Sequence, residues 1–576
     1  EAARKAGPNT ALYHEIAANL AYLEDRRSDR FTHLSASLLD PDNDTPLLHL
    51  HLLSKMSVTL KERMRMEQLC EALQHHPDHD VKTLATYLLG ISLFMRGEMK
   101  RFEKASASIG WNIPLALIGT WDNDQNKGFD ISYPPEQEID MNKTYQGQLV
   151  EIGWRTQYPK AFSTNSINLK ELLHPNVWAI GYLASVIHAT KEGSYELRLS
   201  SSDAIKVWVN NILVFENRHI SKWTFDGIVI PVILRSGANR ILIKSAQNKG
   251  SWQLRARITR PMGMPVDPFM LKALPADTPC PTDTLKMMRP LAPDILPARF
   301  TSTIQNEIRR QFLQIRSARL LGLKISAVKL AETFANTFPT SLPGRFLLAF
   351  ALWDNAERGR TADLLGSLVQ EAGDQLIQIS NKQALFWHQN NLTQKARKLL
   401  FTITTTHPNR PTAWKNLVSI YRQGKWKEDA LNALKVVAKQ WPDWPSVQVQ
   451  LASALESLGY QKPAEAIYRQ LLSYLPNDRL ILQSIFRISR SKQNYTVAEH
   501  YAQQLTDSWP HLRSSWWRQG EIRRQLNDRH GAEKAFLTLI EMAPTAPDGY
   551  HLYAGQAYLY GDRDKAIRFW QKALDR

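Results

Sequence analysis

The sequence predicts a multidomain protein of mixed α and β structure, in which a helical-repeat solenoid carries an inserted antiparallel β-sandwich. Two observations predict this class. Prolines and alanines recur every 34 residues in the C-terminal half, and period-2 alternation of apolar residues replaces helical periodicity near the middle. A chain of 576 residues is also too long for a single core. We expect N-terminal helical hairpins over 1–110, a β-sandwich over 111–262, a proline-rich linker over 263–307 and repeats over 308–576.

The repeats are marked by evenly spaced prolines and alanines. The prolines are Pro408, Pro442, Pro476, Pro510 and Pro544, and the alanines twelve positions before them are Ala396, Ala430, Ala464, Ala498 and Ala532, with Ala566 in the last unit. Stacked helix–turn–helix units have this period. The small alanine suits the point where two antiparallel helices cross, and proline ends the second helix because it lacks an N–H donor.

The same frame predicts about eight units. In the unit that begins at Pro411, apolar residues three and four positions apart form one helix face, and Gly424 is expected to cap that helix in the left-handed conformation. Ala362 extends the series backwards, and a slip of one residue then brings Ala327 into line. The last unit stops at Arg576 without a polar capping helix, so we expect the natural chain to continue.

These units resemble the tetratricopeptide repeat family in their aromatic, small and proline positions, over at least five successive units. In that family the first helix of each unit lines a concave groove. The resemblance places these residues on that face: Lys415, Arg422, Arg487, Arg490, Trp517 and Arg524. Because guanidinium groups hold carboxylates in bidentate fashion, such a groove suits an acidic or carboxylate-ended peptide. The alternative is that each is an ordinary exposed helix residue.

The central region has the alternation of half-buried strands. Strands are expected at 115–121, 195–199, 205–209, 228–232, 240–243 and 252–258. Asn210 and Asn211 tolerate the positive φ of a tight hairpin turn. Six or more antiparallel strands within about 150 residues predict a jelly-roll-like β-sandwich.

Two stretches of this region resemble galactose-binding-like and protective-antigen-like sandwich domains, which bind glycans. They are YELRLSSSDAIKVWVNN at 195–211 and GANRILIK at 237–244. The runs IGTWDN at 118–123, KGFD at 127–130 and YPPE at 133–136 resemble exported bacterial proteins in which repeats flank such a sandwich ahead of a transglutaminase-like domain. This resemblance implies an extracytoplasmic location, in the periplasm or at the cell surface of a bacterium, with the catalytic portion beyond residue 576.

The glycan-binding resemblance selects three candidate residues, which are Trp208, Asp203 and Trp121. Trp208 alternates with inward valines, so an outward indole would stack on a sugar ring; the alternative is that it packs beneath a loop. Calcium-dependent members hold their ion with paired aspartates, whereas this chain offers the single carboxylate of Asp203. Ca²⁺ commonly takes more than one carboxylate, so no metal is expected.

Composition and motifs argue against catalysis. The formal charge of +17 favours acidic partners, although no block of five or six like charges occurs. The chain has no phosphate-cradling glycine loop and no CxxC, HExxH or GxSxG motif, so we predict no catalytic residue, no metal and no cofactor. Cys280 lies between two prolines, without the helix N-terminus or cation that activates a thiol. The His- and Asp-rich run at 75–80 lacks metal-ligand spacing and is interpreted as a turn.

The predicted function is that of a non-enzymatic scaffold or adaptor, which binds a protein or peptide partner in the basic groove within an extracytoplasmic assembly. Two alternatives stay open: a carbohydrate-binding module on a helical spacer, and the regulatory N-terminal part of a transglutaminase-like enzyme. A glycan is therefore a second class of ligand. Nucleic acid is not expected, because Glu456 and Glu521 interrupt the basic positions. Membrane association would run through a partner or through an N-terminal anchor outside this sequence.

Overall fold

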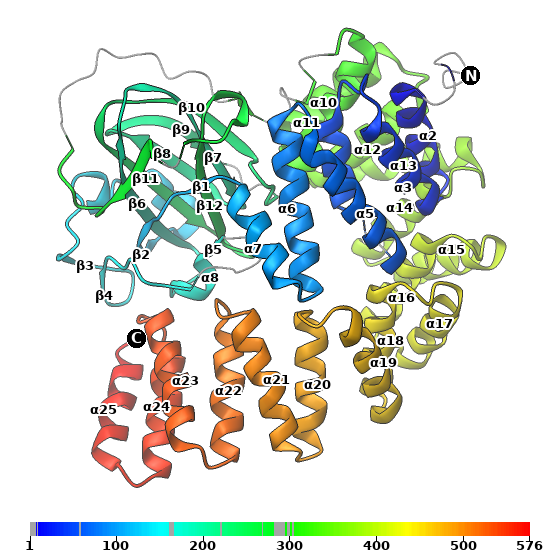
Figure 1. Cartoon of the computed structure of the whole chain (residues 1–576). Coiled ribbons are helices and arrows are strands. Elements are labelled where there is room, and N and C mark those ends of the chain that lie inside the picture. Colours follow the sequence, from blue (N-terminus) through cyan, green and yellow to red (C-terminus); the bar gives the residue numbers. More distant parts are fainter. Residues whose placement is uncertain are drawn as a thin grey trace. The chain divides into compact units, whose positions relative to one another are not determined.

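The chain folds into two compact units in the computed structural model (Figure 1). The structure describes Gly7 and residues 10–56, 59–159, 166–218, 222–267, 269–280, 294–295, 300–301 and 304–576. The first unit comprises residues 1–92 and 297–474, and the second comprises 93–296 and 475–576. Each unit thus joins an early segment of the chain to part of the C-terminal repeats.

Sixteen consecutive helices fill residues 304–576, all of which are described, and they confirm the predicted helical-repeat architecture. The first eight, in the first unit, are α10 Glu307–Leu321, α11 Lys324–Thr337, α12 Leu342–Asp354, α13 Arg358–Ala372, α14 Ile377–Gln389, α15 Thr393–Thr406, α16 Pro411–Gln423 and α17 Lys427–Gln440. Two more helices belong to the first unit, α18 Pro445–Ser457 and α19 Gln461–Tyr474. The second unit has α20 Arg479–Ser491, α21 Tyr495–Ser508, α22 Arg513–Gln525, α23 Arg529–Met542, α24 Pro547–Leu559 and α25 Arg563–Leu574.

Each helix pair turns at one residue in the left-handed region. These residues are Gly322, Ala356, Asn391, Lys425, Gly459, Gln493, Asn527 and Gly561. The next residue donates its N–H to the carbonyl five positions earlier, as Trp426 does to Tyr421 at 2.9 Å, which closes the first helix with a Schellman-type cap. Gly424 was expected at the left-handed position, but its φ is −75°. It is small for another reason, since a Cβ there would lie 2.7 Å from the indole of Trp426.

The periodic alanines lie at the helix crossings. Ala327, Ala396, Ala430, Ala464, Ala498, Ala532 and Ala566 are all at most 2% exposed. The prediction for Ala362 was wrong. Ala362 is exposed, and Thr361 is the fully buried residue at this helix crossing. The one-residue slip in the 34-residue period therefore lies between Thr361 and Ala396, one unit later than predicted. The interval between the left-handed residues Ala356 and Asn391 is longer by the same one residue.

The N-terminal segment is helical as predicted. Its helices are α2 Ala11–Leu23, α3 Arg27–Leu39, α4 Pro46–Ser54, α5 Leu60–Ala72, α6 His79–Met95 and α7 Met99–Ser108. The turn from α2 to α3 has the geometry of the repeats, with φ of 57° at Asp25 and a 2.7 Å bond from the N–H of Arg26 to the carbonyl of Ala21. The His- and Asp-rich run lies at the connection from α5 to α6.

The central region forms two larger antiparallel sheets. The strands are β1 Trp111–Asn112, β2 Ala116–Asp122, β3 Thr144–Gln146, β4 Glu151–Gly153, β5 Ile167–Asn168, β6 Ala179–Ala189, β7 Gly193–Ser201, β8 Ala204–Val209, β9 Ile212–Asn217, β10 Ile228–Leu234, β11 Gly237–Gln247, β12 Gln253–Thr259, β13 Leu271–Leu274 and β14 Asp294–Ile295. One sheet has the order β1-β12-β7-β10-β14, with β5 also paired to β12; the other has the order β13-β6-β11-β8-β9, with β2 also paired to β6. Strands β3 and β4 form a separate pair.

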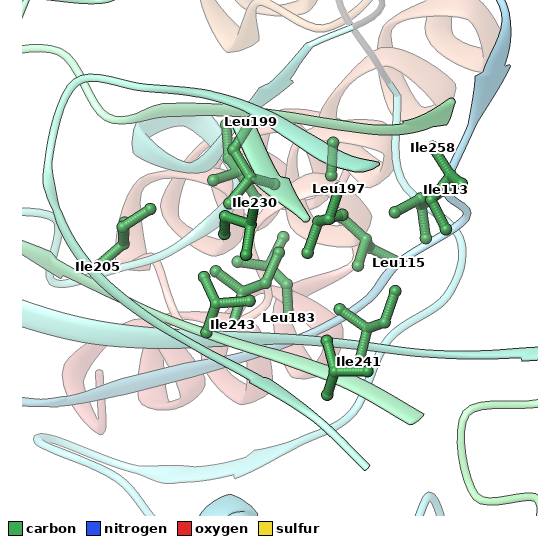
Figure 2. Close-up of a cluster of buried hydrophobic side chains, with 14 of the residues drawn as sticks. Ile113, Leu115, Leu183, Leu197, Leu199, Ile205, Ile230, Ile241, Ile243 and Ile258 are labelled. Atoms are coloured by element: carbon green, nitrogen blue, oxygen red, sulfur yellow. The ribbon is translucent and has the colours of Figure 1, made fainter. Parts of the chain in front are cut away.

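The two larger sheets enclose one apolar core. Figure 2 shows Leu197 and Ile230 of the first sheet pointing toward Leu183 and Ile243 of the second, and all four side chains are fully buried. Each contributes about 1.5–3 kcal/mol relative to exposure. The predicted hairpin is confirmed, since Asn210 and Asn211, with φ of 50° and 67°, join β8 to β9. The long strand β6 was not predicted.

Much of the proline-rich segment that was expected to be a linker lies outside the described residues. The parts that are described add strands to the sheets: β13 pairs with β6, and β14 pairs with β10. Segment 263–307 therefore contributes to the β region at these two places.

Within the second unit, the β region contacts the ends of two repeat helices. A carboxylate oxygen of Glu171 accepts the N–H of Arg513 at 2.8 Å, at the start of α22. The Arg155 guanidinium donates to the carbonyl of Met542 at 2.8 Å, at the end of α23. An anion at a helix N-terminus and a cation at a C-terminus both complement the helix dipole, so these contacts are electrostatically favourable.

Candidate binding surfaces on the repeat helices

The predicted groove residues are divided between the two units. Lys415 and Arg422 lie on α16 in the first unit. Arg487 and Arg490 lie on α20, and Trp517 and Arg524 lie on α22, in the second unit. The structure therefore presents two separate surfaces, with different surroundings.

On α16, Lys415 is enclosed by the chain itself. Its Nζ lies 5.4 Å from the ring centroid of Trp444, and the guanidinium carbon of Arg27 lies 4.8 Å from the same centroid. Trp444 is 1% exposed. Burial lowers the pKa of Lys415, and the nearby charge of Arg27 lowers it further. Lys415 is thus not on an open groove, which corrects the expectation for this residue, whereas Arg422 is exposed.

The N-terminal helices are held against α16 by specific bonds. The carboxylate of Asp25 accepts the N–H of Thr412 at 3.0 Å, in the first turn of α16. The N–H of Leu60 donates to the carbonyl of Asp443 at 2.8 Å. Backbone donors at a helix start need acceptors, and Asp25 supplies one from a distant part of the sequence. This stretch of the repeats therefore already has an intramolecular partner.

A buried ionic cluster fastens the same N-terminal helices to α10. Arg309 donates to Glu15 at 2.6 Å and to Asp44 at 2.6 Å. His49 lies 3.6 Å from Glu15. Although burial alone would raise the pKa of Glu15, its bonds to His49 and Arg309 lower it to about 2.

In the second unit, arginines gather on α20 and α22. Arg479, Arg487 and Arg490 are exposed and recur at intervals of eight and three residues, which places them on one side of α20. Arg518 on α22 lies close to them: burial lowers its pKa, and the charges of Arg487 and Arg479 lower it further. We call Arg479, Arg487, Arg490, Trp517 and Arg518 the arginine face.

The charges of the arginine face are unevenly compensated. Within the described residues, Arg479, Arg490 and Arg518 form no ion pair. The predicted groove residue Arg524, which lies outside this face, is paired with Glu521 at 2.6 Å. Arg518 donates to the carbonyl of Ser514 at 2.7 Å and lies 5.7 Å from the ring of Trp517. Trp517 is 36% exposed. The face therefore offers guanidinium donors beside an accessible indole.

Sequence reasoning missed two members of this face. Arg479 precedes Arg487 by eight residues, about two helical turns, so the helical period alone would have added it. Arg518 directly follows Trp517 on α22. Arg518 lies near Arg487 because α20 and α22 pack together. The spacing of residues within one helix does not predict that packing.

The candidate glycan residues of the β region have different environments. Trp121 is 5% exposed and stacks against Tyr133, with ring centroids 5.4 Å apart. Asp203 is 2% exposed, and burial raises its pKa to about 7 although the hydroxyl of Ser202 donates to it at 2.6 Å. A sugar cannot reach either side chain, which corrects both expectations. Trp208 is half-buried and lines a cavity of about 150 Å³ with Glu136 and Arg240.

The described ranges, with their gaps, contain neither a metal-ligand cluster nor a helix that could span a membrane. No three His, Cys, Asp or Glu side chains in them are arranged to hold a metal ion. No helix in them is both long and apolar enough to cross a membrane.

Comparisons with solved structures find matches at low identity. A tetratricopeptide repeat protein from Parabacteroides merdae ATCC 43184 is 13% identical, with a TM-score of 0.33, over 41% of this chain and 93% of that chain. MamA from Desulfovibrio magneticus RS-1 is 16% identical, with a TM-score of 0.27, over 29% and 93%. The APC/C hetero-tetramer Cut9-Hcn1 is 13% identical, with a TM-score of 0.29, over 48% and 55%. No family model and no curated protein matches the chain.

Proposed function

We propose that this chain is a non-enzymatic scaffold whose arginine face binds an acidic segment of a protein partner. One observation carries the proposal. Arg479, Arg487 and Arg490 are exposed on one side of α20, and Arg518 of α22 forms no ion pair among the described residues. Burial, together with the charges of Arg487 and Arg479, lowers the pKa of Arg518. Positive groups held together in this way repel one another, and a ligand carboxylate relieves that repulsion.

The geometry of the face also suits a peptide. Guanidinium groups bind carboxylates through two parallel hydrogen bonds, which adds direction to the electrostatic attraction. The half-exposed indole of Trp517 provides an apolar anchor beside these donors. The overall charge of +17 would accelerate the approach of an acidic partner, most strongly at low salt.

We place this scaffold in an extracytoplasmic assembly. This part of the proposal rests on the resemblance of the β region to exported bacterial proteins. Fractionation of the native cells with an antibody to the chain tests it directly, and recovery in the cytosolic fraction alone would contradict it.

The binding proposal is tested with the full chain and an array of Asp- and Glu-rich peptides. The best peptide is then titrated by fluorescence anisotropy at low and high KCl concentration. We expect Arg518→Gln and Arg487→Gln each to weaken binding about tenfold to a hundredfold, the range for hydrogen bonds to charged groups. Arg568→Gln is the matched control, because Arg568 is exposed on α25, outside the face. Equal losses in all three variants would reject the arginine face as the site.

A second candidate function is glycan binding at Trp208. The observation that favours it is the cavity of about 150 Å³ in which this half-buried indole lies beside Arg240 and Glu136. A glycan array probed with the full chain and with Trp208→Ala tests the candidate. Sugar binding that disappears in the variant supports it, and an array without signal removes it.

A further inference from the structure

A cavity of about 210 Å³ in the first unit has four cations and one carboxylate among its 12 lining residues. Arg27, Arg30, Lys55 and Lys415 contribute cations, and Asp25 contributes the one carboxylate of its lining. The walls come from the N-terminal segment, from α14, from α16 and from Trp444, directly before α18. Residues far apart in the sequence thus surround one small, strongly charged space.

Arg30 and Lys415 are the cations whose charge is least compensated. Within the described residues neither forms an ion pair; Arg30 contacts the ring of Tyr22, at 4.6 Å, and Lys415 contacts that of Trp444. Burial lowers the pKa of both groups. The carboxylate of Asp25 offsets part of this effect at Lys415. Two half-buried cations that form no ion pair are costly unless an anion joins them.

The remaining charges of the lining are already engaged. The guanidinium of Arg27 is paired with Glu62 at 2.5 Å. Asp25 accepts the N–H of Thr412. Burial raises the pKa of Asp25 to about 6, although its bonds to Thr412 and the charge of Arg410 oppose this. The lining therefore keeps an excess of positive charge, even with Asp25 ionised.

We propose that this cavity is a binding site for a phosphoryl group, with Arg30 and Lys415 as its charge partners. A phosphoryl group carries about 1.5–2 negative charges at neutral pH, which matches the two cations that form no ion pair. A guanidinium matches the geometry of a phosphoryl group and an ammonium adds a compact charge, so Arg30 and Lys415, from different helices, together suit such a group. The site lies in the first unit, so it is independent of the arginine face.

The surroundings leave room for more than a phosphate ion. Tyr22, Leu52 and Met56 add apolar surface to the lining. A second cavity, of about 510 Å³, shares Asp25, Arg27 and Trp444 with the first. Free phosphate and a phosphorylated organic molecule are the two sources of this chemistry.

The test is calorimetric titration of the full chain with inorganic phosphate and with O-phosphoserine, at ionic strength matched by KCl. We expect binding that Arg30→Gln and Lys415→Gln each weaken about tenfold or more, as for hydrogen bonds to charged groups. Lys415→Arg keeps the charge and should retain binding. Arg422→Gln, on the same helix but exposed, and Arg518→Gln, in the arginine face, should bind as the original chain does.

A second readout separates binding from folding. Without ligand, Lys415→Met should unfold at the same temperature as the original chain or higher, because it removes a cation next to Arg27. A residue with only a structural role would lower that temperature when replaced.

The outcomes decide the proposal. Tighter binding of O-phosphoserine than of phosphate identifies a phosphorylated molecule as the ligand, and equal binding identifies the free ion. The proposal fails if neither ligand binds the folded chain, if the substitutions leave binding unchanged, or if citrate binds and phosphate does not. Failure here leaves the peptide experiment on the arginine face unaffected.

Discussion

Helices α16 and α22 occupy equivalent positions in their repeats but have different surroundings. Both receive a carboxylate from a distant segment at their N-terminus, Asp25 in the first unit and Glu171 in the second. On α16, Lys415 is enclosed beside the buried Trp444, whereas on α22 the half-exposed Trp517 lies beside Arg518. The same repeat geometry therefore yields a partly covered cavity in one unit and an accessible basic face in the other, according to which part of the chain covers it.

The largest expected effect tests the repeat packing beneath both surfaces. Ala464 is fully buried at a helix crossing, and Ala362 is exposed. Ala464→Trp should destabilise the protein by more than about 3 kcal/mol, because overpacking of a close crossing forces the helices apart. Ala362→Trp should change stability by less than about 0.5 kcal/mol. Urea unfolding followed by circular dichroism measures both, and similar values would reject the corrected register.

The next effect compares the two tryptophans directly. Trp444→Ala should cost about 3–5 kcal/mol, because it removes a fully buried indole. Trp517→Ala should cost less than about 0.5 kcal/mol while weakening the binding of the acidic peptide. Thermal unfolding and peptide titration of both variants provide the measurement. A large loss of stability in Trp517→Ala would show that this ring is structural.

A pH titration sharpens the description of the first unit. The pKa of Glu15 is lowered from 4.5 to about 2, so its ionised carboxylate stabilises the fold fully above pH 4.5. This contribution to stability is lost as the pH falls toward 2. That contribution to the free energy of unfolding is about 3 kcal/mol by linkage. Stability measured by urea unfolding from pH 6 to pH 2 should fall in this window, and Glu15→Gln should flatten the fall.

Asp25 titrates in the opposite sense and serves as the control for Glu15. Burial raises the pKa of Asp25 from 3.8 to about 6, so the protonated form stabilises the fold and this stability is lost as the pH rises through 6. Asp25→Asn should therefore be at least as stable as the original chain at pH 7. A strong loss at pH 7 would contradict the raised pKa.

The smallest effect concerns the helix end in the second unit. Glu171→Ala removes the acceptor for the N–H of Arg513 and should cost about 0.5–2 kcal/mol, as for other N-terminal caps. Glu171→Gln keeps an acceptor oxygen and should lose less. Thermal unfolding of the two variants distinguishes them, and equal losses would show that charge alone matters at this helix end.

Local periodicity carried most of the fold prediction. The alanines at 34-residue intervals lie at helix crossings, and Asn210 and Asn211 form the predicted hairpin turn. The location of the slip was wrong, because Ala362 imitates the motif one position after the buried Thr361. Strand β6 was missed because it is covered on both faces and so lacks the alternation of a half-buried strand.

The candidate site was less predictable, because long-range packing decides exposure. The helical position of Lys415 was identified, but nothing near it in the sequence indicates that Arg27 and Trp444 enclose it. Trp121 was a candidate glycan residue, yet Tyr133 from the following loop stacks against it. Arg518 joins Arg487 only through the packing of two helices. In each case the deciding neighbour belongs to another element.

The indole of Trp444, which two cations contact, gives the first unit a built-in optical reporter. The emission of an indole responds to the electric field of nearby charges, and Arg27 and Lys415 set that field here. An anion that neutralises Lys415 would change the field and shift the colour of the emitted light. A difference spectrum against Trp444→Phe would isolate this signal from the other 16 tryptophans, so occupancy of the cavity becomes visible without any attached dye.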